Sequence, residues 1–214
     1  MIKYILSTVL LGLSVAAMAA GRVDIGKFSD ASLDGWESKS FVGETKYRFA
    51  EQDGRSVLLA ESYGSASGMG RKMKIDLTKT PYVNWSWKVE RGLPKLDETS
   101  KGGDDYAARL YVVKSGGALI WKTKALNYVW SSNQARDLVW PNAYQPKNAI
   151  MISVRGSDDE IGTWVNEKRN VREDLKLAFG KDIKSIDAVA LMTDTDNSGK
   201  SATAHYGEIY FTAE

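Results

Sequence analysis

The segment YVNWSWKV, residues 82–89, carries the clearest fold signal in this chain. Apolar side chains occupy every second position from Val83 to Val89, and the positions between them are mostly polar. Successive side chains of a strand point to opposite faces of a sheet. The alternation therefore predicts a strand with one buried and one solvated face.

Residues 106–113 alternate in the same way. The positions from Tyr106 to Val112 in steps of two form an apolar face, whereas Arg109 and Tyr111 lie on the opposite face. We expect a second strand here, with Tyr106 pointing into the core.

Further runs of β-forming residues are separated by Gly, Asn, Asp and Ser, which is typical of a β-sandwich. No internal repeat or proline-rich linker divides them. We therefore expect a mainly β fold: a single-domain antiparallel, jelly-roll-like β-sandwich over residues 22–214. The additional strands are expected at residues 57–61, 69–75, 120–130, 149–155, 185–193 and 204–212.

Residues 170–180 predict one short helix packed on a sheet. Asn170 can cap its start, and Glu173 follows three residues later. Val171 and Leu175 begin an apolar stripe, and Gly180 ends the helix.

Residues 1–19 predict a secretory signal peptide. Lys3 supplies positive charge, residues 5–18 form an apolar run, and Ala17 and Ala19 occupy the positions that a signal peptidase reads. The run is shorter than the roughly 20 apolar residues that a spanning helix needs. We expect a periplasmic or secreted protein without stable membrane insertion after cleavage.

The composition excludes several classes of function. The chain has no cysteine, so thiol catalysis and thiolate metal sites are ruled out. Its 29 basic and 27 acidic residues are scattered, so the basic patch of a nucleic-acid binder is missing. His205 is the only histidine, which argues against a multi-histidine zinc site or a Ser-His-Asp triad.

Polar and aromatic side chains gather in the strings KGGDDYAARLYVV (101–113), LNYVW (126–130), WPNAY (140–144) and TWVNEKRN (163–170). Flat rings beside oriented hydrogen-bonding groups suit a sugar ring. The alternative interpretation is that they are core aromatics and cross-strand ion pairs. The candidate ligand-binding residues are Asp105, Arg109, Asn127, Tyr128, Trp130, Trp164, Glu167, Arg169 and Asp194.

The string ALMTDTDNSG, residues 190–199, forms an acidic turn. Asp194 and Asp196 alternate as in the first half of a calcium-binding loop, but His205 stands where such a loop has its glutamate. Two interpretations stay open: a calcium site at Asp194 and Asp196, or a turn stabilised by its own side-chain hydrogen bonds without any cofactor.

These strings, together with NEKRNVREDLKLAFG (166–180) and HYGEIYF (205–211), resemble an uncharacterised family of secreted bacterial proteins known only as a domain of unknown function. The resemblance covers most of the mature chain. It implies an exported single β-sandwich domain and carries no activity or ligand.

A looser resemblance is to galactose-binding-like and carbohydrate-binding jelly rolls. FSDASLDGW (28–36) and GEIYF (207–211) look like the paired first and last strands of such modules. This resemblance implies a structural calcium near Asp30 and Glu208.

The sequence favours an exported, non-catalytic domain that binds a glycan or a similar small polar, polyhydroxylated ligand. Arg109 and Arg169 would suit an acidic group on it. One alternative is a polysaccharide hydrolase or lyase that pairs Glu167 with Asp105 or Asp194. A second alternative is an envelope protein-interaction module. The leading hypothesis requires that the candidate side chains meet above one sheet surface; the oligomeric state is left open.

Overall fold

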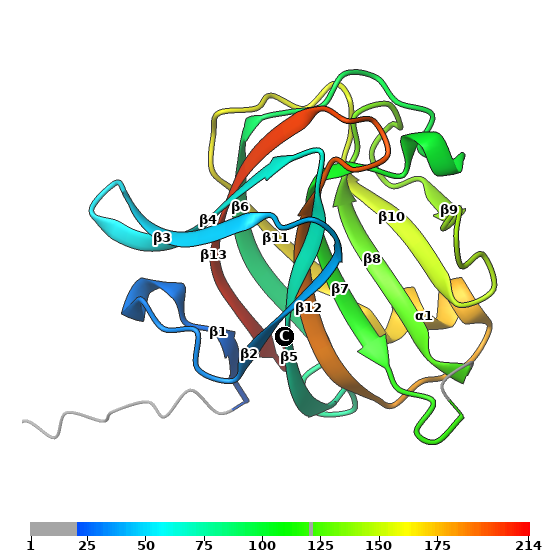
Figure 1. The fold of residues 1–214 in the computed structure, drawn as a ribbon. Helices are drawn as coiled ribbons and strands as arrows, with labels where there is room; N and C mark the ends of the chain where they lie inside the picture. Colours follow the sequence, from blue (N-terminus) through cyan, green and yellow to red (C-terminus); the bar gives the residue numbers. More distant parts are fainter. Residues whose placement is uncertain (1–20, 120–121) are drawn as a thin grey trace, which may run out of the picture.

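The structure, a computed structural model, describes residues 21–119 and 122–214. These residues form two β-sheets packed face to face with one α-helix, so the expected β-sandwich is confirmed (Figure 1). The predicted signal peptide lies outside the described residues, as do Ile120 and Trp121 of the strand expected at 120–130. None of the helices in the described part of the chain has the length and apolar character needed to span a membrane.

Sheet A has six strands in the order β11-β6-β13-β4-β3, with β1 pairing to β13. The chain thus places its first and last strands side by side. The strands of sheet A are β1 (Val23–Gly26), β3 (Lys46–Gln52), β4 (Arg55–Tyr63), β6 (Tyr82–Arg91), β11 (Val165–Asn170) and β13 (Ser201–Thr212).

Sheet B has seven strands in the order β2-β5-β12-β7-β8-β10-β9. Strands β8 and β10 run parallel, and the other paired strands of the described residues are antiparallel. The strands are β2 (Trp36–Val42), β5 (Ala66–Asp76), β7 (Tyr106–Lys114), β8 (Lys124–Trp130), β9 (Val139–Pro141), β10 (Ala149–Arg155) and β12 (Ser185–Asp194). The strand expected at 120–130 begins, within the described residues, only at Lys124.

Aromatic rings from both sheets fill the core between them. Trp85 of β6 stacks on Tyr128 of β8 with ring centroids 5.3 Å apart, and Trp87 contacts Trp130 at 6.0 Å. All four side chains are buried. The alternation in residues 82–89 therefore predicted the inward face of β6 correctly, because large aromatic rings contribute most when they leave water.

The predicted helix is confirmed as α1 (Val171–Phe179). The Asn170 side chain accepts a hydrogen bond from the backbone N–H of Glu173, which is the expected cap. Val171 and Leu175 join the core. Asp174 accepts a hydrogen bond of 2.8 Å from the Tyr128 hydroxyl, which ties the helix to β8.

Strands β3 and β4 form a tight hairpin around Asp53 and Gly54. Both residues have positive φ, 52° and 73°, as a two-residue turn of this kind requires. The hairpin was not predicted, although an Asp-Gly pair between β-forming runs is one of its strongest signals.

The expected pairing of residues 28–36 with residues 207–211 is wrong. Residues Phe28–Asp30 form the 3-10 helix η1, and β2 begins at Trp36 and joins sheet B. The strand that pairs with the end of β13 is β1, with Val23 opposite Phe211. The Glu208 carboxylate accepts a hydrogen bond from the backbone N–H of Ser29, and Asp30 is exposed.

Candidate functional site

The face of sheet B that is turned away from the core contains a hollow and several of the candidate residues. Leu110 and Val112 point into the sandwich, so Arg109 and Tyr111 between them point outward. Residues on neighbouring strands that pair with Tyr111, directly or through one another, form a row across the whole sheet. From one edge to the other the row contains Glu37, Gly70, Ala190, Tyr111, Asn127, Met151 and Trp140.

One half of this face is hollowed. Strands β5 and β12 present only small residues at four outward positions, Gly68, Gly70, Ala188 and Ala190. They form the floor of a hollow of about 450 Å³, which we call the outer-face hollow. The exposed ring of Phe41 on β2 lines it, as do Tyr111 on β7 and the charged side chains Glu37, Lys39 and Lys72.

Gly70 shows why the floor is flat. Its φ lies outside the left-handed region, and a Cβ built on it would meet the Ala190 Cβ at 3.5 Å, an ordinary contact. Neither the backbone nor the packing therefore requires glycine at this position. Glycine inside a strand costs about 0.5–1 kcal/mol. Its effect here is to leave the sheet surface accessible to a close-fitting ligand.

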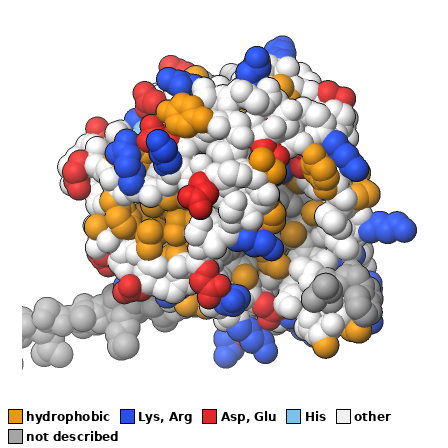
Figure 2. Space-filling view, viewed as in Figure 1, with side chains coloured by type: hydrophobic (Ala, Val, Ile, Leu, Met, Phe, Trp, Pro, Cys, Tyr) orange, Lys and Arg blue, Asp and Glu red, His pale blue; other side chains and the backbone are white. Residues whose placement is uncertain are grey.

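Surface charge around the sandwich is mixed. On the side of the molecule seen in Figure 2, acidic and basic side chains are interspersed with hydrophobic ones. This agrees with the balanced composition of the chain.

Arg109 lies beside the hollow but is almost completely buried. Its Nη1 is 2.9 Å from Oδ2 of Asp194, and its Nη2 is 3.1 Å from Oδ1 of Asp104. The guanidinium carbon lies 4.3 Å from the ring centroid of Tyr106 and 5.5 Å from that of Tyr111. The guanidinium already has protein partners, so the expectation that it meets an acidic ligand has no support in this geometry.

The orientation expected for Tyr106 is wrong. The pairing of β12 with β7 shifts register between Met192 and Asp194. Such a shift changes which side chains face the core. Ala107 and Ala108 both join the main core, whereas Tyr106 packs in a separate small cluster of buried residues on the other side of the sheet. Its partners there are Val129, Trp140 and Met151.

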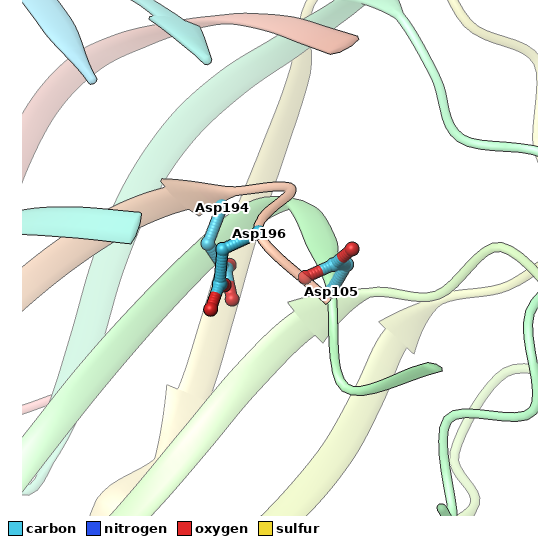
Figure 3. A group of neighbouring side chains, drawn as sticks. All are labelled: Asp105, Asp194 and Asp196. Carbon is cyan, nitrogen blue, oxygen red and sulfur yellow. The ribbon is translucent and has the colours of Figure 1, made fainter. Parts of the chain in front are cut away.

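The acidic turn lies at the end of β12, next to the Arg109 ion pairs. One carboxylate oxygen each of Asp105, Asp194 and Asp196 lies within 4.8 Å of the others (Figure 3). Asp105 also holds the turn, because it accepts hydrogen bonds from the backbone N–H groups of Asn197 and Ser198. Burial raises the pKa of Asp194 above its ordinary value, with Arg109 opposing and the neighbouring carboxylates adding to the rise.

Asn127 also lies on the outer side of sheet B, where its side chain is buried and donates to the Ile150 carbonyl. Tyr128 and Trp130 point the other way and belong to the core. Trp130 also lines a separate hollow of about 370 Å³ among loops at the end of the sandwich.

The remaining candidates belong to sheet A. On β11, Glu167 accepts hydrogen bonds from Arg155 at 2.5 Å and from the Trp87 ring at 3.3 Å. Arg169 forms a two-point ion pair with Asp174. Trp164 precedes β11, and its ring centroid lies 6.3 Å from that of His205 on β13.

The expectation that all candidate side chains meet above one sheet surface is therefore wrong. Asp105, Arg109 and Asp194 are brought together, Asn127 lies on the same side of sheet B, and the others lie in the core or on sheet A. The outer-face hollow was missed. Its signal in the sequence was the alternation of glycine or alanine with larger residues at positions 68–70 and 188–190.

Comparison with known proteins adds the fold context. The chain is similar to the family 11 carbohydrate-binding module of the cellulosomal cellulase Lic26A-Cel5E of Clostridium thermocellum, with 12% identity and a TM-score of 0.50 over 92% of this chain and 96% of that one. It is also similar to a thermostable cellulase derived from Cel12A of Rhodothermus marinus (10% identity, TM-score 0.49, 88% of this chain and 99% of that one). A third similar structure is the CBM22-1 xylan-binding domain from Paenibacillus barcinonensis Xyn10C (13% identity, TM-score 0.42, 92% and 99%).

At 12% identity, the likeness to the family 11 module shows a shared jelly-roll sandwich and no more. A comparison with curated protein sequences finds no match. A family model does match residues 34–210, most of the chain. The chain belongs to the family described as "Protein of unknown function (DUF3047)".

Proposed function

We propose that this protein is an exported, non-catalytic domain that binds a glycan or a similar polyhydroxylated chain in the outer-face hollow. The observation that carries the proposal is the hollow itself. A flat floor of glycine and alanine lies between two aromatic residues, Phe41 and Tyr111, and charged groups stand at its rim.

The chemistry of the hollow suits sugar rings. A sugar offers an apolar face that packs on a flat surface and hydroxyl groups that need oriented partners. Phe41 is 61% exposed, so the face of its ring is available for stacking on a sugar. Glu37, Lys39 and Lys72 supply hydrogen-bond acceptors and donors at the rim.

The distribution of carboxylates favours binding over cleavage. Glycosidic cleavage normally uses two carboxylates that face each other across the scissile bond. Among the described residues that line the hollow, the only carboxylate is that of Glu37, and it pairs with Lys72 at 2.9 Å. The clustered aspartates lie outside the lining of this hollow.

Export is part of the proposal and is supported by the signal-peptide pattern of residues 1–19. The measurement is the mass of the protein recovered from the periplasm or medium of expressing cells. Cleavage after Ala19 is the expected result, and an uncleaved protein confined to the cytoplasm would contradict it.

The binding test uses the exported protein, a panel of neutral and acidic polysaccharides, and affinity electrophoresis followed by calorimetry. For the polysaccharide that binds, Phe41→Ala and Tyr111→Ala are expected to weaken binding at least about tenfold, which corresponds to about 1.4 kcal/mol. Gly70→Leu is expected to abolish binding by filling the floor. The matched control is Tyr63→Ala, which removes a similarly exposed ring from sheet A and should leave binding unchanged. Failure of every polysaccharide to bind, or wild-type binding by Gly70→Leu, would rule the proposal out.

A further inference from the structure

We infer that Asp105, Asp194 and Asp196 form a calcium-binding site at the end of β12. The site lies outside the lining of the outer-face hollow, and the inference does not depend on the proposed glycan binding.

The three carboxylates come from two segments that the fold brings together. Asp194 is the last residue of β12, Asp196 lies in the turn that follows, and Asp105 directly precedes β7. Figure 3 shows the carboxyl groups of Asp194 and Asp196 side by side, with Asp105 on the neighbouring segment.

The spacing of the oxygens suits calcium. Calcium binds oxygen ligands at about 2.3–2.6 Å, so oxygens on opposite sides of the ion are up to about 5 Å apart. The three aspartates each offer one oxygen within 4.8 Å of the others. Magnesium demands a strict octahedron with distances of about 2.0–2.1 Å and keeps several of its waters, so a site built from three carboxylates favours calcium.

A second observation points to a cation. The Asp194 side chain is only 3% exposed, and its Oδ2 pairs with Arg109. Its Oδ1 has no hydrogen-bond partner among the described residues. A buried polar atom without a partner destabilises the folded protein. A cation held between Asp194 and Asp196 would give this oxygen the partner that it lacks.

The local charge balance points the same way. Four carboxylates, those of Asp104, Asp105, Asp194 and Asp196, lie around one guanidinium, that of Arg109. A divalent cation would offset two of the excess negative charges. Asp196 is half-buried rather than sealed, so water can reach the site and complete the coordination sphere that calcium requires.

The test uses the protein expressed from the whole sequence, after removal of metal with EDTA. Calcium chloride alone is titrated by calorimetry, and thermal unfolding is followed with and without calcium. We expect one calcium ion per chain, a rise in Tm that grows with calcium concentration, and at least tenfold weaker binding of magnesium.

The variant Asp196→Asn keeps the size of a half-exposed side chain and is expected to fold. It should weaken calcium binding at least tenfold and abolish the rise in Tm. The matched control Asp158→Asn removes an exposed carboxylate elsewhere and should bind calcium like wild type. Absence of binding at millimolar calcium, or equal affinity of Asp196→Asn and wild type, would overturn the inference. No glycan is present in these measurements, so their outcome is separate from that of the binding proposal.

Discussion

Arg109 and Asp194 form an ion pair of 2.9 Å in which the side chains are only 6% and 3% exposed. A buried pair is costly to break, because removal of one partner leaves an uncompensated charge in a medium of low polarity. Arg109→Met is therefore expected to lower the free energy of unfolding by about 3–5 kcal/mol. Urea denaturation in calcium-free buffer measures the change.

The control for this prediction is Arg48→Met. Arg48 pairs with Glu61 at 3.3 Å, but its side chain is 59% exposed. Exposed pairs contribute at most about 1 kcal/mol. If both variants lost the same free energy of unfolding, burial would not explain the contribution of the Arg109 ion pair to stability.

Tyr128 was a candidate ligand-binding residue, and its position in the core predicts a different role. Its hydroxyl donates to Asp174 of α1 at 2.8 Å. Tyr128→Phe should lower the free energy of unfolding by about 1 kcal/mol, since Asp174 keeps its ion pair with Arg169. Glycan affinity should not change. If Tyr128→Phe had wild-type stability but bound glycan more weakly, Tyr128 would instead be a ligand-binding residue.

The sequence predicted best those elements whose side chains alternate in a single register. Residues 82–89 are such a case, because every second side chain is apolar along the whole strand and this alternation alone identifies the buried face. Tyr106 shows the limit of this reasoning. Its strand, β7, pairs with β12, and the register of this pairing shifts between Met192 and Asp194. The shift depends on β12, so residues 106–113 alone do not predict it.

The candidate site was predicted only in part for the same reason. Asp105, Arg109 and Asp194 lie close together because β7 and β12 are neighbours in sheet B. The rings of Tyr128 and Trp130 have the same chemistry as surface stacking platforms, and only their packing against sheet A shows that they belong to the core. Glu167 and Arg169 were candidate ligand-binding residues with ion pairs as the alternative interpretation, and in the fold each has an ion-pair partner.

His205 predicts a pH dependence of stability. Its pKa is lowered from the usual 6.5, first by burial and then by the charge of Lys88, with a smaller contribution from Arg48, whereas Glu90 and Glu61 act in the opposite direction. As the pH falls, His205 therefore becomes protonated near pH 6.5 in the unfolded chain but only at a lower pH in the folded chain. The stabilisation is present above about pH 6.5 and is lost as the pH falls through the lowered pKa.

Thermal unfolding between pH 7.5 and pH 5 measures this effect. His205→Gln removes the titrating group, so its Tm should fall less over this range than that of the wild type. The carboxylates titrate in both proteins and cancel in the comparison. Identical pH profiles would show that His205 does not couple protonation to folding.

Gly54 predicts a test of the β3–β4 hairpin. Its φ is 73°, and no atom lies within 4 Å of a Cβ built on it, so alanine would meet no clash there. Any loss of stability in Gly54→Ala must therefore come from the left-handed backbone, which costs a residue with a Cβ about 1–2 kcal/mol.

The control is Gly102, in the 3-10 helix η2 (Lys101–Gly103). It is also exposed and free of neighbours, but its φ lies outside the left-handed region. Gly102→Ala should leave stability unchanged or raise it slightly, because alanine reduces the freedom of the unfolded chain. Urea denaturation of the two variants measures the difference, and equal stabilities would contradict the hairpin geometry at Asp53 and Gly54.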